Sequence, residues 1–479
     1  MYYPVKQLRN LERQHLAQGL PLMQRAGQAA ADFVSQRFGS AAQLLVVAGP
    51  GNNGGDALVT ARLLKQRGYT VHLLFRGEVD RLPADAAAAW REWQAAGGLV
   101  VDKIPPHPVT AVIDGGFGIG LNRPLDADWK TLIAAVNALQ RPLLALDVPS
   151  GIAADSGARL GAAMHARWTL SFIGRARGLA TGAARDHVGE LHCDTLGLDL
   201  TTTPPPICCS RQLAAKTRLP RETDSHKGRF GTVAVLGGSA GMAGAALLAG
   251  RAALHAGAGK VLLGLLDPQA PSVDPLQAEL MLGPAEPQRL APADVLVVGP
   301  GLGPTGGPLL QWALDSDKPL VLDADALNLL AGAPELRHHL AVRAHPCLLT
   351  PHPSEAARLL GVDTAAVQAD RYHAARSLAS GLAATVLLKG AGSIVDDGHH
   401  TAVNPSGSAA LANAGQGDVL SGLLGALLAQ GLAPWQAANL GAWVHGAASD
   451  ALVANDGRLV TPASEVLLAV DRLLGAQRA

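Results

Sequence analysis

A glycine-rich segment near the end of the sequence carries one carboxylate, Asp418. The segment reads Gly415-Gln416-Gly417-Asp418 and leads into the apolar residues 419–424, so we expect a helix to begin there. Backbone amides at such a helix start can approach a phosphate group closely. A carboxylate beside that phosphate is explained if Asp418 accepts a hydroxyl proton during phosphoryl transfer. The alternative is an aspartate that only stabilises the start of the helix.

Two further side chains in the second half are suited to ligand binding. His352 stands between two prolines that fix its backbone, and we interpret it as facing a ligand rather than as part of a plain loop. Lys389 precedes a glycine loop, where a lysine commonly meets phosphate, although it could also be a solvated strand end. The sequence contains no H-E-x-x-H or P-loop motif and no cluster of Cys and His, so it supports neither zinc catalysis nor a P-loop.

In the first half, polar side chains follow three apolar segments. Asp147 comes directly after residues 143–146 and could act as a general acid or base, or it could only form a turn at the end of a strand. Three such positions beside glycine are a stronger signal than any one of them. The polar residues at these positions are Asn52, Asn53 and Asp56, then Asp114, then Asp147 and Ser150.

Residues 49–54 match the pattern G-x-G-x-x-G, which invites comparison with dinucleotide-dependent oxidoreductases. That pattern is specific only when an acidic residue ends the following strand and binds a ribose. The following apolar segment ends in Phe75-Arg76-Gly77 and has no carboxylate at its tip. The extra side-chain oxygens of this turn suit a monovalent cation or a ribose phosphate held in another way, so hydride transfer is disfavoured.

The elements that must position these residues alternate between strands and helices. This alternation predicts an α/β fold with a doubly wound, mostly parallel sheet, which binds ligands at the carboxyl ends of its strands. In the first half we expect two helices within residues 5–38, strands at 44–48, 71–75, 111–113 and 143–146, and helices at 57–67, 84–96 and 129–139.

The alternation stops at residues 201–206, where three threonines precede three prolines. Such a run is a stiff connector, and we place a domain boundary there. Residues 418–450 are largely apolar, but Gly431 and Pro434 interrupt them, which predicts two buried helices rather than a membrane span. After the connector we expect strands at 231–237, 261–265, 295–298, 320–322, 348–349 and 386–389 and a helix at 244–255, each strand leading into a polar or glycine loop.

Length and charge limit the classes of partner. A chain of 479 residues with a formal net charge of zero suggests two or three domains and offers no basic block for nucleic acid or for a membrane surface. Its four cysteines have no disulfide or metal spacing, and the first residues do not resemble a signal peptide. We therefore expect a cytoplasmic protein that acts on small molecules, and we also expect a homo-oligomer.

With these motifs identified, the chain resembles a known pair of enzymes. Residues 23–27, 51–56, 114–120 and 146–151 are similar to those of NAD(P)H-hydrate epimerase domains. Residues 226–228, 299–303, 322–328, 350–355, 389–392 and 415–418 are similar to those of ribokinase-like NAD(P)H-hydrate dehydratases. The order and the length resemble the bifunctional repair enzymes over nearly the whole chain.

The resemblance implies a Rossmann-like epimerase domain at residues 1–205 and a ribokinase-like dehydratase domain at residues 206–479. The first would interconvert the R and S forms of hydrated NADH and NADPH. The second would dehydrate the S form with ADP and release AMP and phosphate. The competing hypothesis is a ribokinase-like kinase of a small alcohol whose amino-terminal domain only binds a partner.

The resemblance also implies individual roles, with Asp418 and Asp147 as the catalytic residues. Potassium in the epimerase and magnesium in the dehydratase are the implied metals, and ADP is the implied co-substrate. Ala57 and Gln416 depart from the family pattern. Implied for the hydrate are Asn52, Asn53, Gly54, Gly55, Asp56, Gly118, Ile119, Gly120, Leu121, Asn122, Arg123, Pro124, Asp147, Ala245, Gly303, His352 and Asp418; for the nucleotide Lys389, Gly390, Ala391, Gly392, Ser393 and Gly417; and for potassium Asn53, Asp114 and Ser150.

Overall fold

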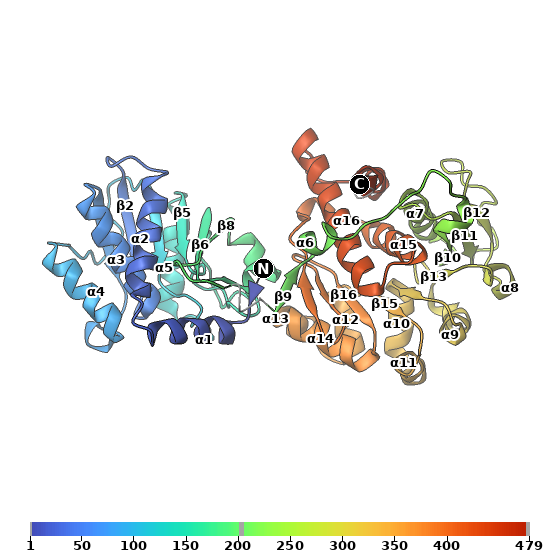
Figure 1. The fold of residues 1–479 in the computed structure, drawn as a ribbon, viewed down its shortest axis with the longest axis horizontal. Coiled ribbons are helices and arrows are strands. Elements are labelled where there is room, and N and C mark those ends of the chain that lie inside the picture. The colour runs from blue at the N-terminus through green and yellow to red at the C-terminus, as the bar shows by residue number, and fades with distance from the viewer. Residues whose placement is uncertain (1, 201–205, 476–479) are drawn as a thin grey trace. The chain divides into compact units, whose positions relative to one another are not determined.

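The structure, a computed structural model, describes residues 2–200 and 206–475 of the chain (Figure 1). Contacts divide the chain into two compact units, Met1–Ile207 and Cys208–Ala479. Each unit has an apolar core of its own. Of the expected connector, residues 201–205 lie outside the described residues.

A parallel sheet forms the centre of the first unit, and every pair of neighbouring strands in it runs in the same direction. Because β2, β4 and β5 are adjacent, the polar residues at their carboxyl ends reach the same edge of the sheet. Within residues 2–200 the strands are, in order across the sheet, β3 (Thr70–Phe75), β2 (Gln43–Ala48), β4 (Ala111–Gly115), β5 (Leu143–Leu146), β6 (Trp168–Phe172) and β8 (Glu190–Asp194).

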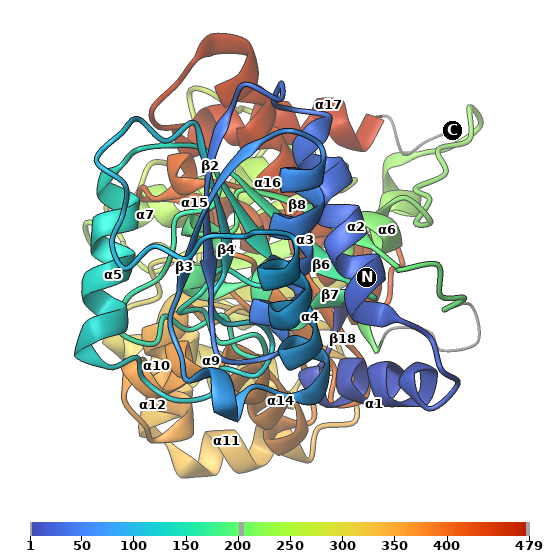
Figure 2. The ribbon, with the colours of Figure 1, turned by 90° about the vertical axis from the view of Figure 1, so that its left-hand side faces the viewer.

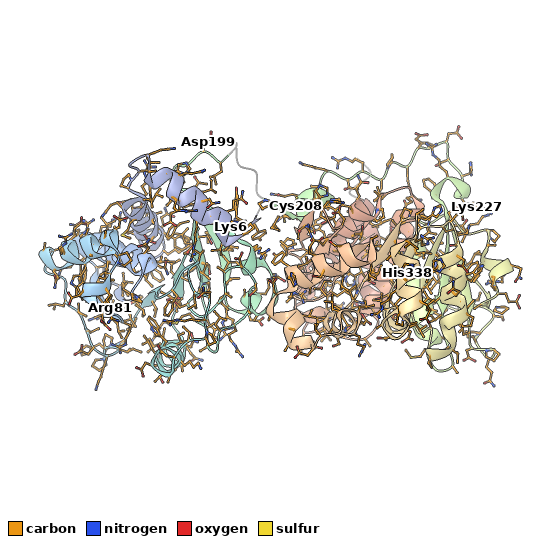
Figure 3. All side chains as sticks on the ribbon, turned by 90° about the horizontal axis from the view of Figure 1, so that it is seen from below. Lys6, Arg81, Asp199, Cys208, Lys227 and His338 are labelled. Carbon is orange, nitrogen blue, oxygen red and sulfur yellow. The ribbon has the colours of Figure 1, made fainter. Side chains whose placement is uncertain are left out.

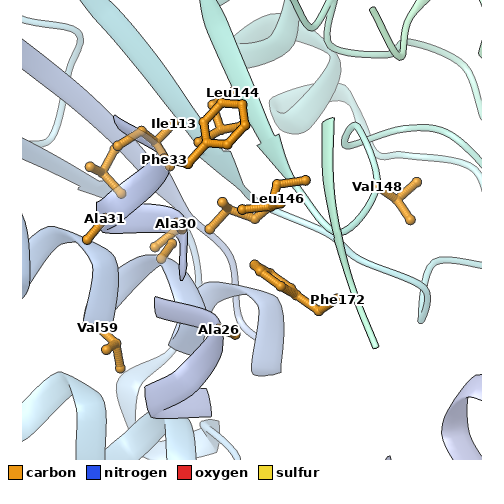
Figure 4. Close-up of a cluster of buried hydrophobic side chains, with 14 of the residues drawn as sticks. Ala26, Ala30, Ala31, Phe33, Val59, Ile113, Leu144, Leu146, Val148 and Phe172 are labelled. Carbon is orange, nitrogen blue, oxygen red and sulfur yellow. The ribbon is translucent and has the colours of Figure 1, made fainter. Parts of the chain in front are cut away.

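Helices cover both faces of this sheet (Figure 2). Leu44 and Val46 of β2 join a core with helices α2 and α3, whereas Leu45 and Val47 join a second core with helix α5, as expected when successive side chains of a strand alternate between faces. Figure 4 shows part of the first core. The helices are α1 (Val5–Leu16), α2 (Leu22–Ser35), α3 (Asn52–Gln66), α4 (Ala84–Ala95) and α5 (Ala127–Ala138).

The second unit contains a longer sheet that is parallel from β12 to β16 and antiparallel from β16 to β18. The antiparallel end is a hairpin built around residues 389–393. Across this part of the sheet the strands are β12 (Met281–Pro284), β11 (Lys260–Leu265), β10 (Thr232–Gly237), β13 (Val295–Val298), β14 (Leu320–Leu322), β15 (Cys347–Leu349), β16 (Thr385–Leu388), β17 (Ile394–Asp396) and β18 (Thr401–Val403).

The helices of the second unit include the two that residues 418–450 predict, and the break between them falls at Gly431 and Pro434. Helix α15, which carries Asp418, packs against α7. The helices are α6 (Ser210–Ala214), α7 (Ala243–His255), α8 (Pro287–Leu290), α9 (Gly307–Asp315), α10 (Ala324–Gly332), α11 (Pro334–Ala341), α12 (Pro353–Leu360), α13 (Thr364–Ala369), α14 (Arg371–Leu382), α15 (Gln416–Ala429), α16 (Pro434–Asp456) and α17 (Ala463–Gly475).

The predicted α/β architecture of two domains with mostly parallel sheets is confirmed, but two predicted loops are wrong. Helix α3 begins at Asn52, so residues 52–56 form its first turns. Helix α10 begins at Ala324, directly after β14 and Asp323. Gly54 explains the first difference, since a Cβ there would lie 2.0 Å from the backbone oxygen of Gly49, and only glycine lets the helix begin so close to the strand exit.

Charged side chains lie at the surface of both units. Lys6, Arg81 and Lys227 are exposed and are labelled in Figure 3. Across residues 2–200 and 206–475, no helix has the length and apolar character needed to cross a membrane.

The contact between α15 and α7 gives a test of the fold. A Cβ on Gly422 would lie 1.9 Å from the backbone oxygen of Ala249, so Gly422→Ala must push the two helices apart. We expect it to lower the free energy of unfolding by about 1–3 kcal/mol, the usual cost of overpacking. Gly381→Ala in α14 is the matched control, because no atom lies within 4 Å of its added Cβ. Calorimetry of both variants that gave equal melting temperatures would contradict the close packing.

Candidate active sites

A cavity of about 480 Å³ opens at the carboxyl ends of the strands of the first unit. Gly54 and Gly55 do not line it, since they contact Gly49 and Met23 beneath the surface, and Pro124 lines a neighbouring cavity. Of the predicted hydrate-binding residues, those in the lining are Asn52, Asn53, Asp56, Gly118, Ile119, Gly120, Leu121, Asn122, Arg123 and Asp147.

Asp147 is held in place by an unusual backbone conformation and by hydrogen bonds from neighbouring backbone amides. Its φ of 63° lies in the left-handed region, which aspartate and asparagine adopt more readily than most residues. Its Oδ2 accepts a hydrogen bond from the amide of Ile119 at 2.9 Å, and a Cβ on Gly118 would lie only 2.6 Å from the same oxygen. The loop therefore wraps closely around the carboxylate.

The pKa of Asp147 is raised to about 6. Burial is the main cause, the hydrogen bond from Ile119 opposes it, and the charge of Glu12 adds to it. Burial, followed by the charges of Asp147 and Glu12, raises the pKa of Asp56 well above its ordinary value. A carboxyl group with a pKa near 6 can both give and take a proton near neutral pH.

Glu12 and Arg9 of α1 also line this cavity, and sequence reasoning missed both. Burial raises the pKa of Glu12, Arg9 lowers it and Asp85 raises it. The sequence signal that could have identified them is the amphipathic spacing of α1. This spacing places Leu8 and Leu11 in the core and Arg9 and Glu12 on the neighbouring face of the helix. That pattern alone is typical of any amphipathic helix.

Asp114 and Ser150 are hydrogen-bonded to each other at the ends of β4 and β5, and Asn53 of the cavity lining lies against the end of β4. Asp114 is fully buried; its Oδ1 accepts hydrogen bonds from the Ser150 hydroxyl at 2.6 Å and the Gly116 amide at 3.1 Å, and its Oδ2 accepts one from the Ser150 amide at 2.8 Å. Burial raises the pKa of Asp114, and these hydrogen bonds oppose that rise. A Cβ on Gly115 would lie 2.8 Å from the backbone oxygen of Asn53, so Asn53 lies against the end of β4.

The side chain of Asn53 fits a bound cation. Asn53 is 8% exposed, and neither its Oδ1 nor its Nδ2 has a hydrogen-bond partner among the residues that the structure describes. Buried amide groups without partners are rare and call for an explanation such as an ion. An amide oxygen, a carboxylate and a hydroxyl are suitable oxygen donors for potassium.

In the second unit, Asp418 lies in the first turn of α15, as predicted. The N-cap residue is Gly415 with a φ of 87°, and no side chain caps the helix, so Asp418 does not serve as the cap. The pKa of Asp418 is raised to about 6, mainly by burial and next by the charge of Asp323, while Lys389 lowers it and Asp325 raises it. Asp418 is therefore a base that ionises just below neutral pH.

Lys389 and Asp323 form a partly buried ion pair beside Asp418. The Lys389 Nζ lies 2.7 Å from the Asp323 Oδ1, and a Cβ on Gly417 would lie 3.2 Å from the same nitrogen. Burial alone would lower the pKa of Lys389, but Asp323 and Glu355 more than offset this, so its pKa is raised. The predicted phosphate ligands Lys389 and Gly417 are thus brought together.

His352 caps its own helix. Its Nδ1 accepts hydrogen bonds from the amides of Ser354 at 3.1 Å and Glu355 at 3.4 Å, and its Nε2 lies 3.2 Å from the Glu355 Oε1. Burial, with Lys389 and Arg358, lowers the pKa of His352. The ligand-facing role of His352 stays a prediction, although its side chain remains half-exposed.

Glu355 and Asp325, to which the sequence analysis gave no role, belong to the cluster of charged side chains around Lys389 and Asp418. Burial raises the pKa of Glu355 to about 7, although Lys389 opposes this. Asp325 accepts a hydrogen bond from the amide of Gly303 at 2.8 Å.

Two predicted hydrate-binding residues meet at the neighbouring turn. A Cβ on Gly301 would contact Ala245 at 3.3 Å, so Ala245 of α7 lies beside the turn that contains Gly303. Because the Gly303 amide is hydrogen-bonded to Asp325, the turn adjoins the carboxylates that raise the pKa of Asp418.

Sequence comparisons agree with both halves of this description. A family model described as NAD(P)H-hydrate dehydratase matches residues 233–470, and a model described as YjeF-related protein N-terminus matches residues 19–178. The bifunctional NAD(P)H-hydrate repair enzyme of Escherichia coli (strain K12) is 39% identical over 469 residues, which cover 95% of this chain and 90% of that protein. The chain belongs to the family of bifunctional NAD(P)H-hydrate repair enzymes.

One further relative supports the assignment for the first half of this repair-enzyme chain, and one solved structure shares the fold of the second half. The NAD(P)H-hydrate epimerase of Achromobacter xylosoxidans (strain A8) is 55% identical over 201 residues, which are 42% of this chain and 97% of that protein. A solved structure of a hypothetical protein from Streptococcus mutans has a TM-score of 0.50 and 24% identity, covering 56% of this chain and 98% of that chain, and it shows a shared fold alone. Family membership favours the repair reading over the alcohol-kinase alternative.

The raised pKa of Asp147 in this repair enzyme predicts how stability changes with pH. A carboxyl group that titrates near 6 when folded and near 3.8 when unfolded holds its proton more tightly in the folded state. Its contribution to folding is therefore fully present below pH 4 and is lost as the pH rises to 6. Asp147→Asn cannot ionise, and we expect it to be more stable than the wild type above pH 6, by up to about 3 kcal/mol.

Calorimetry of both proteins between pH 4 and pH 8 measures this difference. We expect the two unfolding free energies to converge at the acid end of the range. A gap that widens at low pH would show that the sign is wrong.

Proposed function

We propose that residues 1–205 interconvert the R and S forms of hydrated NADH and NADPH, and that residues 206–479 dehydrate the S form with ADP. The observation that carries this proposal is the pair of partly buried carboxylates, Asp147 and Asp418, each with a pKa of about 6. Each lies beside glycine-rich backbone at the carboxyl ends of a parallel sheet. The family relationship supplies the substrate.

Epimerisation requires reversible breaking of one bond at C6 of the hydrated ring, which the ring nitrogen assists. Asp147, in its protonated form, gives a proton to the departing hydroxyl group and takes it back when water returns to the other face. The amide of Ile119 keeps the carboxyl group oriented in the cavity. Glu12 favours the protonated form of Asp147 through its negative charge, which adds Glu12 to the groups that we propose for epimerisation.

Asn53, Asp114 and Ser150 would hold potassium next to this cavity. A bound monovalent cation supplies positive charge that orients polar groups of the substrate. Asn53 supplies an amide without an internal partner, while Asp114 supplies a buried carboxylate.

Dehydration is harder because hydroxide is a poor leaving group. We propose that the C6 hydroxyl attacks the terminal phosphorus of ADP while Asp418 takes the hydroxyl proton, which gives AMP and a phosphate ester. The C6–O bond then breaks with loss of a proton from C5, which releases phosphate and restores the reduced nicotinamide. Lys389 and the amides near Gly417 stabilise the charge on the phosphoryl group.

Magnesium would enter this site with the nucleotide. Among residues 2–200 and 206–475, no three His, Cys, Asp or Glu side chains converge as a metal site. Magnesium commonly binds through one or two carboxylates and the phosphate oxygens of a substrate, and carboxylates are available beside Lys389. Cytoplasmic location and assembly into a homo-oligomer remain parts of the proposal that separate measurements must test.

Asp418→Asn tests the division between the two units. The variant keeps the size of the side chain but removes the base, so we expect ADP-dependent recovery of NADH to fall by at least about 100-fold. Exchange between the R and S hydrates should be unchanged, because it takes place at the Asp147 site and does not use Asp418. Absorbance near 340 nm follows the first reaction and chromatography the second.

The matched control for Asp418→Asn is Asp397→Asn. Asp397 lies at a hairpin turn, where its side chain accepts hydrogen bonds from the amides of His399 and His400. It should retain both activities. If Asp418→Asn abolished hydrate exchange as well, the assignment of two separate sites would be wrong.

Asn53→Ala tests the potassium site. We expect the wild-type rate of epimerisation to rise with potassium and to fall when lithium replaces it. In the variant, the increase in rate caused by potassium should be at least about tenfold smaller, because one oxygen ligand is missing. Asn52→Ala is the control, since Asn52 lines the cavity beside the substrate and should change the KM for hydrate but not the response to potassium. Equal salt dependence in the wild type and Asn53→Ala would exclude Asn53 as a ligand.

A further inference from the structure

Arg371 is a charged residue that lies almost completely inside the second unit. It is 1% exposed, and arginine is rarely buried to this degree unless its charge has a specific task. Burial lowers its pKa to about 10, so the guanidinium group is still charged at neutral pH. Arg371 is the first residue of α14, and neither the sequence motifs nor the proposed mechanism gives it a role.

The guanidinium group of Arg371 lies under the end of β16. Its Nη2 donates hydrogen bonds to the carbonyl oxygens of Leu388 at 3.3 Å and Lys389 at 3.0 Å, and its Nη1 donates one to the side chain of Gln368 at 2.9 Å. One planar side chain thus binds the backbone on both sides of the Lys389 Cα. Gly390 is the next residue, and a Cβ there would lie 3.0 Å from both terminal nitrogens of the guanidinium group.

These bonds decide where the neighbouring amides point. In a trans peptide the carbonyl of one residue and the amide of the next point in opposite directions. The Leu388 carbonyl faces Arg371, and the Lys389 amide accordingly points away from it and donates to the Pro351 carbonyl at 2.8 Å. By the same geometry, the Lys389 carbonyl faces Arg371 and the Gly390 amide points away from the guanidinium group. Gly390 is itself exposed, and we propose that the nucleotide binds on this side.

The same contacts orient the Lys389 side chain. With its backbone fixed from both sides, Lys389 extends its ammonium group to Asp323 and to the position next to Gly417. The Arg371 charge also lies directly beneath residues 389–393, where a positive potential favours an anion. The arrangement therefore connects a residue buried in α14 to the proposed phosphate ligands.

We propose that Arg371 is a positioning residue for the nucleotide: it fixes the end of β16 so that the Gly390 amide and the Lys389 ammonium group face the phosphates of ADP. This inference rests on the proposed dehydratase function. Lysine cannot replace arginine here, because one ammonium group has no planar fork to reach both carbonyls and Gln368.

Binding of ADP to the full chain, measured by titration calorimetry, tests this role together with steady-state kinetics. We expect Arg371→Lys to raise the Kd and the KM for ADP by about tenfold, in line with the loss of one or two hydrogen bonds from a charged donor. The KM for hydrated NADH and the exchange of R and S forms should stay within about twofold of the wild type.

Two variants complete the test. Arg376→Lys, on the same helix, is the matched control, because Arg376 donates to Gly398 and Thr401 on a different turn, and its affinity for ADP should be unchanged. Gly390→Ala disturbs the contact from the other side and should also weaken ADP binding, so the proposal does not depend on one variant folding.

An unchanged Kd for ADP in Arg371→Lys overturns the proposal. So does a uniform loss of ADP binding, hydrate KM and kcat with a lower melting temperature, which would indicate a purely structural role. If the wild-type chain neither binds ADP nor uses it to convert hydrated NADH, the dehydratase proposal itself fails, and the two failures are therefore distinguishable.

Discussion

Both candidate sites depend on backbone contacts between neighbouring strand ends that only glycine permits. A Cβ on Gly49 would lie 1.8 Å from the backbone oxygen of Gly116, and one on Gly299 would lie 1.8 Å from that of Asp323. The first contact joins the end of β2 to the end of β4, and the second joins β13 to β14. Because no side chain separates these strand ends, the polar residues that follow them converge over a few ångströms.

Bringing several carboxylates close together and away from water is electrostatically unfavourable, and the two units offset this cost in different ways. In the first unit, Glu12, Asp56 and Asp147 line one cavity, and burial raises the pKa of all three. The charge of Glu12 adds to the rise for Asp147 and Asp56, and that of Asp85 adds to the rise for Glu12. In the second unit, Lys389 lies among the carboxylates and pairs with Asp323. The first site therefore favours a protonated carboxyl group, whereas the second keeps a fixed positive charge next to an ionisable base.

The sequence predicted the alternation of strands and helices, the position of Asp418 in a first helical turn, and the polar residues at the strand ends, because each of these is encoded within a few neighbouring residues. It did not predict that α3 begins at Asn52, since that start depends on a contact with Gly49. Glu12 and Arg371 were missed for a related reason. Their helices have ordinary local patterns, and only the tertiary fold brings them against a cavity or a strand end distant in sequence.

The difference in charge between the two sites matches the two chemical tasks. Moving a hydroxyl group between two faces of a ring changes no net charge, so a shared proton held by a carboxyl group with a pKa of about 6 is sufficient. Phosphoryl transfer develops negative charge on oxygen, so it needs a permanent cation and oriented amides. Lys389 supplies that cation, with its backbone carbonyl hydrogen-bonded to Arg371 and its ammonium group paired with Asp323. Lys389 lowers the pKa of Asp418, but burial and the charges of Asp323 and Asp325 outweigh it and keep that pKa at about 6, so the Asp418 carboxylate can still accept the hydroxyl proton.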